Sequence, residues 1–282
     1  MNNLDLGTIG FGCMKASFNN PDEATRASTI EAIHVALDHG VRLFDTADIY
    51  APTWDTFGHN ELLVAEAVRT HPKGSSAIIA TKGGITRKPG EVWGRNASLD
   101  YLLRAVEASA GRLGVSKIDL WQHHRLDPNL PFEQQLENLA GLRQRGLIEH
   151  LGVSNYSANQ LRRAVEIVGP IATVQNQLSL AYRNELDVLE VCEEFGINYL
   201  PWSPMKGAHG RDASPELRDF AANHSASTYA VAVAWLVPLP GVTRPASVID
   251  ALSGLDLALS GDVPLAESLP MDAELLSDQP SS

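Results

Sequence analysis

A tyrosine, a lysine, an acid and a histidine of this chain are of types that could transfer a proton together. They are Tyr50, Lys82, Asp45 and one of the neighbours His123 and His124. In free peptides tyrosine and lysine both titrate near pH ~10, so neither is useful at neutral pH without a neighbour. An ammonium beside a phenol favours the phenolate, and a carboxylate keeps the ammonium charged and oriented. A phenol tuned in this way can donate a proton to an oxygen that is gaining negative charge, while a histidine binds that oxygen.

Metal and disulfide chemistry is not expected from this sequence. No His-x-x-x-His segment and no cluster of acids stands at the spacing that metal ligands need. The two cysteines, Cys13 and Cys192, form neither a disulfide framework nor a zinc site. A hydrolase that uses Asp45 and Glu61 as a pair of acids is an alternative, but no second acid ends a predicted strand.

The composition suits a globular protein with a large core. Of the 282 residues, 44% are hydrophobic and 20% are charged. The formal net charge of -12 argues against binding to nucleic acid or to an anionic membrane, because both need a basic surface. No apolar run reaches the ~20 residues that span a bilayer, and residues 1–10 lack the pattern of a secretory signal. We therefore expect a cytoplasmic protein that is a monomer, with a homo-oligomer as the alternative.

Short apolar runs alternate with amphipathic segments along the whole chain. Each run is too short for a helix and lacks the strict alternation of a half-exposed strand, so each suits a strand covered on both faces. There are eight such runs, at residues 8–12, 41–45, 77–81, 118–124, 151–154, 172–176, 197–202 and 237–241. Helices are expected at residues 23–40, 60–70, 98–114, 131–146, 157–169, 184–196, 215–236 and 245–258.

Eight strand–helix units in alternation predict one parallel sheet covered by helices, and eight is the number that closes a (β/α)8 barrel. The alternative is an open, doubly wound sheet, which normally carries a G-x-G-x-x-G turn after its first strand when it binds a dinucleotide. The segment "GFGCMKAS" lacks the third glycine. We therefore predict an α/β protein with a single TIM barrel over residues 1–282, in which the last ~20 residues are a partly disordered tail.

Five segments resemble those of the aldo-keto reductase superfamily, whose members are NAD(P)-dependent oxidoreductases built on a (β/α)8 barrel. They are "DTADIY", "IATKGG", "IDLWQHHRLDP", "LGVSNY" and "VQNQLSL", and the likeness extends from "GFGCM" to "LPGVTRPASVIDAL". The resemblance implies that Tyr50 is the general acid and that Lys82 and Asp45 form a charged pair that lowers its pKa. It also implies that His124, and not His123, positions the carbonyl oxygen of an aldehyde or ketone substrate.

The same resemblance implies contacts to a nicotinamide cofactor. Ser154, Asn155 and Gln175 would hold the carboxamide, and the turn after the seventh strand would lie along the pyrophosphate. NADPH is favoured over NADH because Arg244, with Lys206 or Arg211, could bind a 2′-phosphate. The full set of expected cofactor contacts is Cys13, Met14, Asp45, Ser154, Asn155, Gln175, Trp202, Ser203, Pro204, Met205, Gly207, Gly241, Thr243, Arg244, Ser247 and Asp250.

Two features depart from the family pattern. Ser247 stands where many members have arginine or glutamine, and Ala251 stands where they have asparagine. The segment "VAVAWLVPLPG" runs from the seventh helix almost directly into the eighth strand, where a connection of ~2–6 residues is usual. We expect a shortened helix and a tight join there, with the barrel still closed.

The substrate is expected to be a small carbonyl compound held by Tyr50, His124 and two tryptophans on long loops, Trp54 and Trp93. The loop after Lys82 is also basic, which would attract a phosphorylated or carboxylated substrate, unless it is an ordinary solvated loop. Its cations are Arg87, Lys88 and Arg95.

Other polar residues near the predicted site have structural interpretations. Asp48 is expected to be a solvated turn residue, and His123 a packed residue. Arg125 and Asp127 are expected to form an ion pair that fixes their loop. The main alternative to an enzyme is a nucleotide-binding accessory or sensor protein on the same fold, like the potassium-channel β-subunits.

Overall fold

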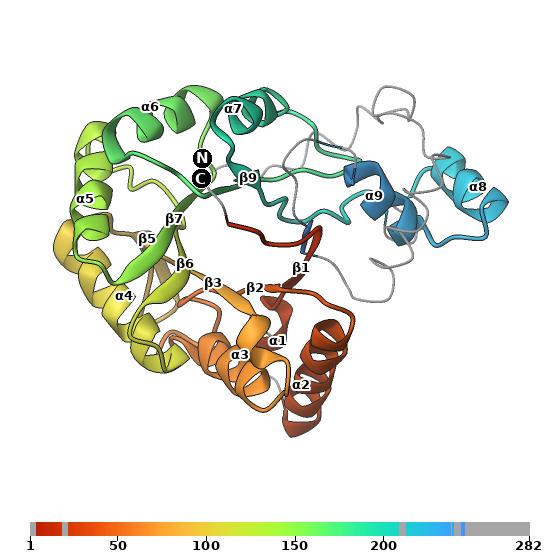
Figure 1. Cartoon of the computed structure of the whole chain (residues 1–282), viewed down its shortest axis with the longest axis horizontal. Helices are drawn as coiled ribbons and strands as arrows, with labels where there is room; N and C mark the ends of the chain where they lie inside the picture. The colour runs from red at the N-terminus through yellow and green to blue at the C-terminus, as the bar shows by residue number, and fades with distance from the viewer. Residues whose placement is uncertain (1–3, 19–21, 209–212, 238, 240–243, 246–282) are drawn as a thin grey trace.

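The computed structural model describes residues 4–18, 22–208, 213–237, 239 and 244–245. Eight strands form one sheet in the order β10-β1-β2-β3-β6-β7-β8-β9, and all neighbours are parallel. Figure 1 shows the strands curling around the middle of the molecule with the helices outside them. The strands are β1 (Ile9–Gly12), β2 (Leu43–Asp45), β3 (Ile78–Gly83), β6 (Ile118–His123), β7 (Ile148–Ser154), β8 (Thr173–Gln175), β9 (Asn198–Tyr199) and β10 (Arg244–Pro245).

The helices follow the strands in the expected alternation, and several begin or end at residues suited to those positions. Ser157 caps the helix that follows β7 through a capping box with Gln160, and Gly114 ends the helix before β6 in the left-handed conformation. The described helices are α1 (Lys15–Phe18), α2 (Glu23–Asp38), α3 (His59–Arg69), the 3-10 turn η1 (Gly74–Ser76), α4 (Leu99–Leu113), α5 (Phe132–Gln144), α6 (Ala158–Val168), α7 (Asp187–Phe195), α8 (Pro215–Asn223) and α9 (Thr228–Leu236).

The inside of the curled sheet has an apolar layer, followed by a polar layer toward the carboxyl ends of the strands. One buried cluster combines Leu6 from the N-terminal segment with Leu43, Ala80 and Leu120 from strands, and with Ala172 and Leu200, which directly flank β8 and β9. Because side chains alternate along a strand, the residue two positions further on faces the same side. For β2, β3 and β6 these residues are Asp45, Lys82 and Gln122, so the sheet places polar groups together at the carboxyl ends of its strands.

The end of the described chain differs from the sequence prediction. Of the eighth strand predicted at 237–241, only Val237 and Leu239 are described, and neither lies in a strand; the described strand that pairs with β1 is Arg244–Pro245. Residues 230–236 of α9 are all buried and lie within the helix that the sequence predicts at 215–236. The predicted helix at 245–258, the tail and most of the predicted tight join lie outside the described residues.

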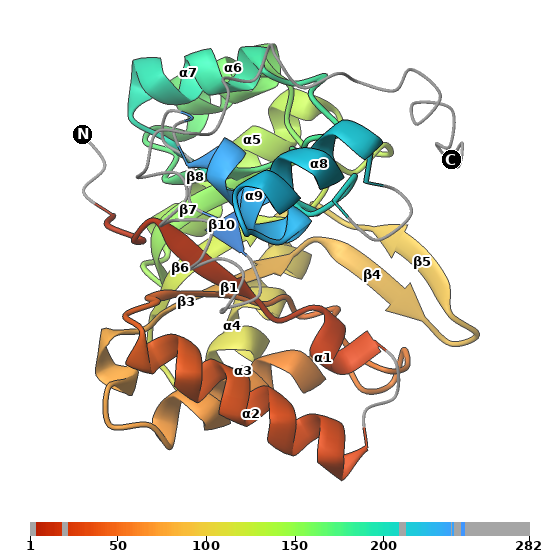
Figure 2. The same ribbon diagram turned by 90° about the vertical axis from the view of Figure 1, so that its right-hand side faces the viewer.

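Two further differences concern local backbone conformation. The helix expected at 215–236 is divided into α8 and α9, because Ser225 adopts a left-handed conformation and Ser227 starts a new helix. The loop after Lys82 contains an antiparallel hairpin, β4 (Ile85–Lys88) and β5 (Val92–Arg95), which projects from the sheet (Figure 2). Gly90 and Glu91, both with positive φ, form its turn.

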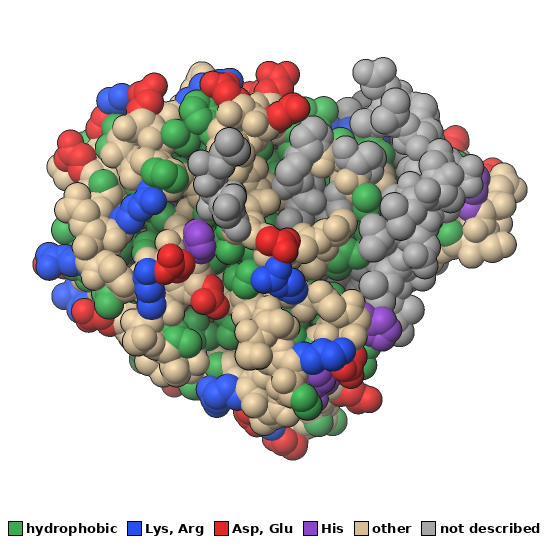
Figure 3. Space-filling model, viewed as in Figure 1, with side chains coloured by type: hydrophobic (Ala, Val, Ile, Leu, Met, Phe, Trp, Pro, Cys, Tyr) green, Lys and Arg blue, Asp and Glu red, His purple; other side chains and the backbone are tan. Residues whose placement is uncertain are grey.

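Charged side chains of both signs lie on the surface. On the face seen in Figure 3, acidic and basic side chains of the described residues are interspersed over the outer helices. Among the helices that the structure describes, none has both the length and the apolar character needed to cross a membrane.

Candidate active site

Lys82 lies at the centre of a buried polar cluster at the carboxyl ends of β2 and β3. Its ammonium donates to Asp45 Oδ2 at 2.8 Å, to the carbonyl oxygen of Thr46 at 2.8 Å and to Tyr50 Oη at 3.2 Å. A lysine ammonium has three protons, so these three acceptors satisfy it. The side chain is 0% exposed, and such a buried charge is tolerated because it is paired and fully hydrogen-bonded. The structure therefore brings together the predicted Asp45, Tyr50 and Lys82.

The titration of this cluster differs in part from the prediction. Burial opposes the charge of Lys82, but Asp45 and Tyr50 together raise its pKa, so the lysine remains an ammonium. Burial raises the pKa of Tyr50, and the neighbouring ammonium of Lys82 acts in the opposite direction without overcoming it. The prediction that the pair lowers the tyrosine pKa is therefore wrong for the net shift: Lys82 lowers the pKa of Tyr50, whereas burial and Asp45 raise it. The net result is a phenol that keeps its proton at neutral pH.

Gln122 extends the cluster across the inside of the sheet, and the sequence analysis missed it. Its amide donates to Asp45 Oδ1 at 3.4 Å and accepts a hydrogen bond from Thr173 Oγ1 at 3.1 Å. The available signal was strand parity, since Gln122 follows the buried Leu120 by two positions.

His124 faces Tyr50 across the cavity. The two rings are 5.9 Å apart and nearly perpendicular, and the backbone N–H of His124 donates to the carbonyl oxygen of Gly83 at 2.9 Å. Burial and then the positive charges of Lys82 and Arg125 hold the pKa of His124 well below its ordinary value. The imidazole is therefore neutral and can donate one hydrogen bond to a substrate oxygen.

His123 has the packed position expected for it. Its Nδ1 lies 2.9 Å from Tyr156 Oη, and its side chain is 0% exposed. Burial lowers the pKa of His123 to about 4, so this residue is a neutral core histidine.

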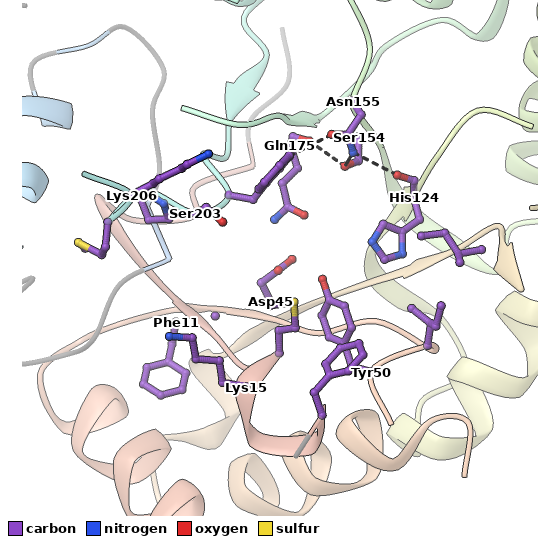
Figure 4. Close-up of a pocket in the computed structure, with 18 of the residues that line it drawn as sticks. Phe11, Lys15, Asp45, Tyr50, His124, Ser154, Asn155, Gln175, Ser203 and Lys206 are labelled. Atoms are coloured by element: carbon purple, nitrogen blue, oxygen red, sulfur yellow. Dashed lines mark hydrogen bonds between the residues drawn. The ribbon is translucent and has the colours of Figure 1, made fainter. Parts of the chain in front are cut away.

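Tyr50, Asp45, His124 and Gln175 point into one cavity of about 1470 Å³ (Figure 4). It extends from these residues past the turn after β9 to the exposed side of α2. Lys15 and Lys206 line the side of the cavity opposite His124 (Figure 4). Predicted residues that line the cavity are Met14, Asp45, Tyr50, Trp93, His124, Ser154, Asn155, Gln175, Trp202, Ser203, Pro204, Met205 and Lys206.

A second polar cluster joins the ends of β7 and β8. Ser154 Oγ donates to the carbonyl oxygen of Gln175 at 2.7 Å and accepts from Asn155 Nδ2 at 2.6 Å, while Asn155 Oδ1 accepts from Trp202 Nε1 at 3.0 Å. Asn155 has a positive φ of 61°, and its backbone N–H donates to Asn176 Oδ1 at 2.6 Å. Asn176, which is not among the predicted site residues, is 0% exposed and holds this strained position in place.

These residues fit the carboxamide of a nicotinamide ring. A carboxamide needs both donors and acceptors, and the hydroxyl of Ser154 and the amides of Asn155 and Gln175 provide both. The side-chain amide of Gln175 projects into the cavity and makes no hydrogen bond to the described residues. It is therefore available to a ligand.

The turn after β9 supplies a narrow wall of the same cavity. Ser203 and Gly207 both have positive φ, and the backbone N–H of Lys206 donates to the carbonyl oxygen of Ser203 at 3.1 Å. A Cβ on Gly207 would lie 2.7 Å from the Cβ of Ala181, so this position requires glycine.

Three other predicted contacts, Cys13, Trp54 and Gly207, are not among the residues that line the cavity. Cys13 is buried, and its thiol lies 3.7 Å from the carbonyl oxygen of Phe11. Trp54 lies on the exposed part of its loop, whereas Trp93 stacks on Phe18 at the cavity edge. Arg244 is described as part of β10 only through its backbone. Arg211, Gly241, Thr243, Ser247, Asp250 and Ala251 lie outside the described residues.

The expected ion pair between Arg125 and Asp127 is absent from the described residues. Asp127 instead accepts hydrogen bonds from the backbone N–H groups of Ala97 at 3.3 Å and Asn129 at 2.9 Å. Arg125 lines the cavity, with its guanidinium 5.8 Å from the centre of the Trp202 ring.

The hairpin loop is ordered, and of its three cations Arg87 is paired, whereas Lys88 and Arg95 are exposed. Arg87 forms an ion pair with Glu91 and donates to the carbonyl oxygens of Ala51 at 2.8 Å and Pro52 at 2.9 Å. Arg87 thus ties the hairpin to the loop that carries Tyr50.

Asp48 is buried, so its interpretation as a solvated turn residue is wrong. The residue is 1% exposed, and its Oδ1 has no hydrogen-bond partner among the described residues. Burial, and then the charge of Glu61, hold the pKa of this carboxyl well above its ordinary value. Glu61 accepts hydrogen bonds from Thr81 and Arg112, both at 2.5 Å, and is not among the residues that line the cavity, so it does not serve as the second acid of the hydrolase alternative.

The buried carboxyl of Asp48 makes stability depend on pH. Because the folded state holds this proton to a higher pH than the unfolded state, wild-type stability falls as pH rises between the two pKa values. Asp48→Asn has no proton to lose there. Its free energy of unfolding relative to wild type should therefore increase from pH 5 to pH 8, by up to ~1.4 kcal/mol per pH unit. Urea unfolding at both pH values measures this difference, and an equal difference at both would contradict it.

The chain has relatives among known proteins. The model of the aldo/keto reductase family matches residues 8–262. An uncharacterised oxidoreductase of Schizosaccharomyces pombe is 30% identical over 269 residues, with 92% of this chain and 84% of that protein covered. A probable aldo-keto reductase of Glycine max is 30% identical over 294 residues, with 91% and 83% covered.

The chain is also similar to proteins of solved structure. A glycerol dehydrogenase from Gluconobacter oxydans has a TM-score of 0.76 and 26% identity, with 96% of this chain and 95% of that chain covered. Such similarity implies a (β/α)8 barrel, of which the described strands form a curled parallel sheet.

Proposed function

We propose that this chain, which belongs to the aldo/keto reductase family, reduces an aldehyde or ketone to an alcohol with NADPH as its hydride donor. Membership of this family, with relatives named as oxidoreductases, makes the chain an enzyme and not only an accessory or sensor protein. The observation that carries the proposal is the phenol of Tyr50, 3.2 Å from the ammonium of Lys82 and facing the cavity beside His124.

The side chains of this site divide the work of proton transfer. When bound, NADPH supplies a hydride to the carbonyl carbon. Tyr50 holds its proton at neutral pH and gives it to the carbonyl oxygen as negative charge develops there. The ammonium of Lys82, kept charged by Asp45, stabilises the phenolate that remains until a proton from solvent replaces the one transferred. The neutral ring of His124 donates a hydrogen bond to the same carbonyl oxygen and orients it.

The choice of NADPH over NADH is supported by positive charge at one end of the cavity. Lys15 and Lys206 line the side of the cavity opposite His124. A 2′-phosphate would meet cations there in a protein whose net charge is -12.

Titration of the protein with NADPH and with NADH tests the proposed function. Quenching of tryptophan fluorescence should report binding, because Trp202 lines the cavity. We expect NADPH to bind at least ~10-fold more tightly than NADH, which corresponds to ~1.4 kcal/mol for the phosphate contact. Lys206→Met should weaken NADPH more than NADH. Equal affinities would contradict the choice of NADPH, and binding of neither, or no turnover with a panel of aldehydes and ketones, would contradict the reductase itself.

A further inference from the structure

We propose that Arg125 binds a carboxylate on the substrate, so that the substrate class is a carbonyl compound that also carries a carboxylate. This inference rests on the proposed function and narrows it. Arg125 directly follows His124, the residue that would orient the carbonyl oxygen, and both line the cavity. One small molecule can therefore contact His124 with its carbonyl group and Arg125 with its anionic group.

Arg125 has no acidic partner in the part of the chain that the structure describes. Asp127, its expected partner, is used by the backbone N–H groups of Ala97 and Asn129. The guanidinium makes no ion pair and no hydrogen bond with the described residues, although it is only partly exposed. Its contact is the face of the Trp202 ring, at 5.8 Å, and that ring is fixed by a hydrogen bond to Asn155.

The surrounding charges leave a place for a single negative charge. Burial and then the charge of Arg95 lower the pKa of Arg125, while Glu185 acts in the opposite direction. Arg95 donates a hydrogen bond to the carbonyl oxygen of Leu126 at 3.1 Å, and Glu185 accepts one from the amide of Asn176 at 2.7 Å. Neither Arg95 nor Glu185 is paired with Arg125. Because Glu185 would repel a dianion more strongly than a monoanion, a phosphate fits this place less well than a carboxylate.

A partly buried guanidinium without a counterion is energetically unfavourable, because its charge has lost water contacts and gained no anionic partner. Burial removes part of the hydration of the guanidinium, which costs free energy, and contact with an anion would offset this cost. A planar guanidinium can bind a carboxylate through two parallel hydrogen bonds. The neighbouring wall of the cavity is apolar and suits the body of such a substrate. It is formed by Phe18, Ile49, Ile85 and Trp93.

Two aldehydes of similar shape provide the test: 4-carboxybenzaldehyde and 4-methylbenzaldehyde. The measured quantity is the ratio of their kcat/KM values. Hydrogen bonds to charged groups lead us to expect that Arg125→Met lowers this ratio roughly 10- to 100-fold. Arg125→Lys should restore part of it, because lysine keeps the charge but not the two parallel hydrogen bonds. Lys88→Met is the matched control, since it removes one positive charge from an exposed hairpin residue that does not line the cavity.

A second measurement does not depend on turnover. Binding of 4-(hydroxymethyl)benzoate and of benzyl alcohol, followed by tryptophan fluorescence, should differ in wild type and become nearly equal in Arg125→Met. An unchanged kcat/KM ratio while both aldehydes are reduced would overturn the inference and leave the proposed function intact. An unchanged ratio with weaker NADPH binding would place Arg125 in the cofactor site and also overturn it. If neither aldehyde is reduced, the panel of aldehydes and ketones tests the proposed function, and equal binding of 4-(hydroxymethyl)benzoate to wild type and Arg125→Met would overturn the inference by itself.

Discussion

Replacing Tyr50 with phenylalanine is expected to lower kcat for carbonyl reduction by about 10²–10⁴-fold, the range that general acid catalysis contributes. The change removes one hydroxyl, which lies 3.2 Å from Lys82 Nζ. The ring keeps its neighbours, Phe18 at 5.7 Å and His124 at 5.9 Å, so the cavity should retain its shape. Affinity for NADPH should therefore stay within about twofold, since only the proton donor is lost.

The matched control for this substitution is Tyr101→Phe. The hydroxyl of Tyr101 donates to the carbonyl oxygen of Ile85 at 3.2 Å, and the residue does not line the cavity. Both variants lose one phenolic hydroxyl, but only Tyr50→Phe should lose turnover. Steady-state kinetics with a responsive aldehyde and fluorescence titration with NADPH separate the two effects. If Tyr50→Phe kept more than a tenth of wild-type kcat, another group would have to supply the proton.

The proton-transfer residues could be predicted because strand periodicity and strand ends are local signals. Asp45 and Lys82 end apolar runs, and in a parallel sheet such ends meet at one edge. The observed hydrogen bond between them, at 2.8 Å, follows from the parallel pairing of β2 with β3. Seven of the eight predicted strands lie where the sequence places them for the same reason.

The residues that hold the site in place were harder to predict, because their roles depend on contacts between distant segments. Asn176 fixes Asn155 from another strand, and Gln122 bridges Asp45 and Thr173 across the inside of the sheet. Strand parity places Gln122 on the inner face of the sheet but does not name its partners, and the position of Asn176 after β8 gives no such signal.

The errors have similar physical causes. Arg125 and Asp127 are close in sequence and opposite in charge, yet Asp127 is used by backbone N–H groups of its own and a neighbouring loop. Asp48 looks like a turn acid, but its turn folds inward against Glu61 and Gly83. Charge and proximity in sequence do not reveal which backbone groups need a partner, and in folded proteins those needs are nearly always met.

Replacing Lys82 with methionine is expected to destabilise the fold as well as abolish turnover. The ammonium is buried, and its removal leaves the carboxylate of Asp45, which is 6% exposed, with the amide of Gln122 at 3.4 Å. Breaking a buried ion pair from one side costs ~3–5 kcal/mol. Lys117→Met is the surface control, because the ion pair Lys117–Glu149 is exposed to solvent and should contribute far less to the free energy of unfolding. Urea unfolding of the three proteins gives both differences.

The double variant Lys82→Met with Asp45→Asn separates the structural role of the pair from its catalytic role. Neutralising Asp45 removes the uncompensated charge, so the double variant should recover at least half of the stability that Lys82→Met alone loses. Its kcat should nevertheless stay as low as that of the single variant, because no ammonium remains to stabilise the phenolate of Tyr50. Recovery of stability without recovery of turnover would mean that the charge of Lys82 acts on the phenol. Recovery of both would mean that the lysine matters only for folding and that the phenol needs no neighbouring cation.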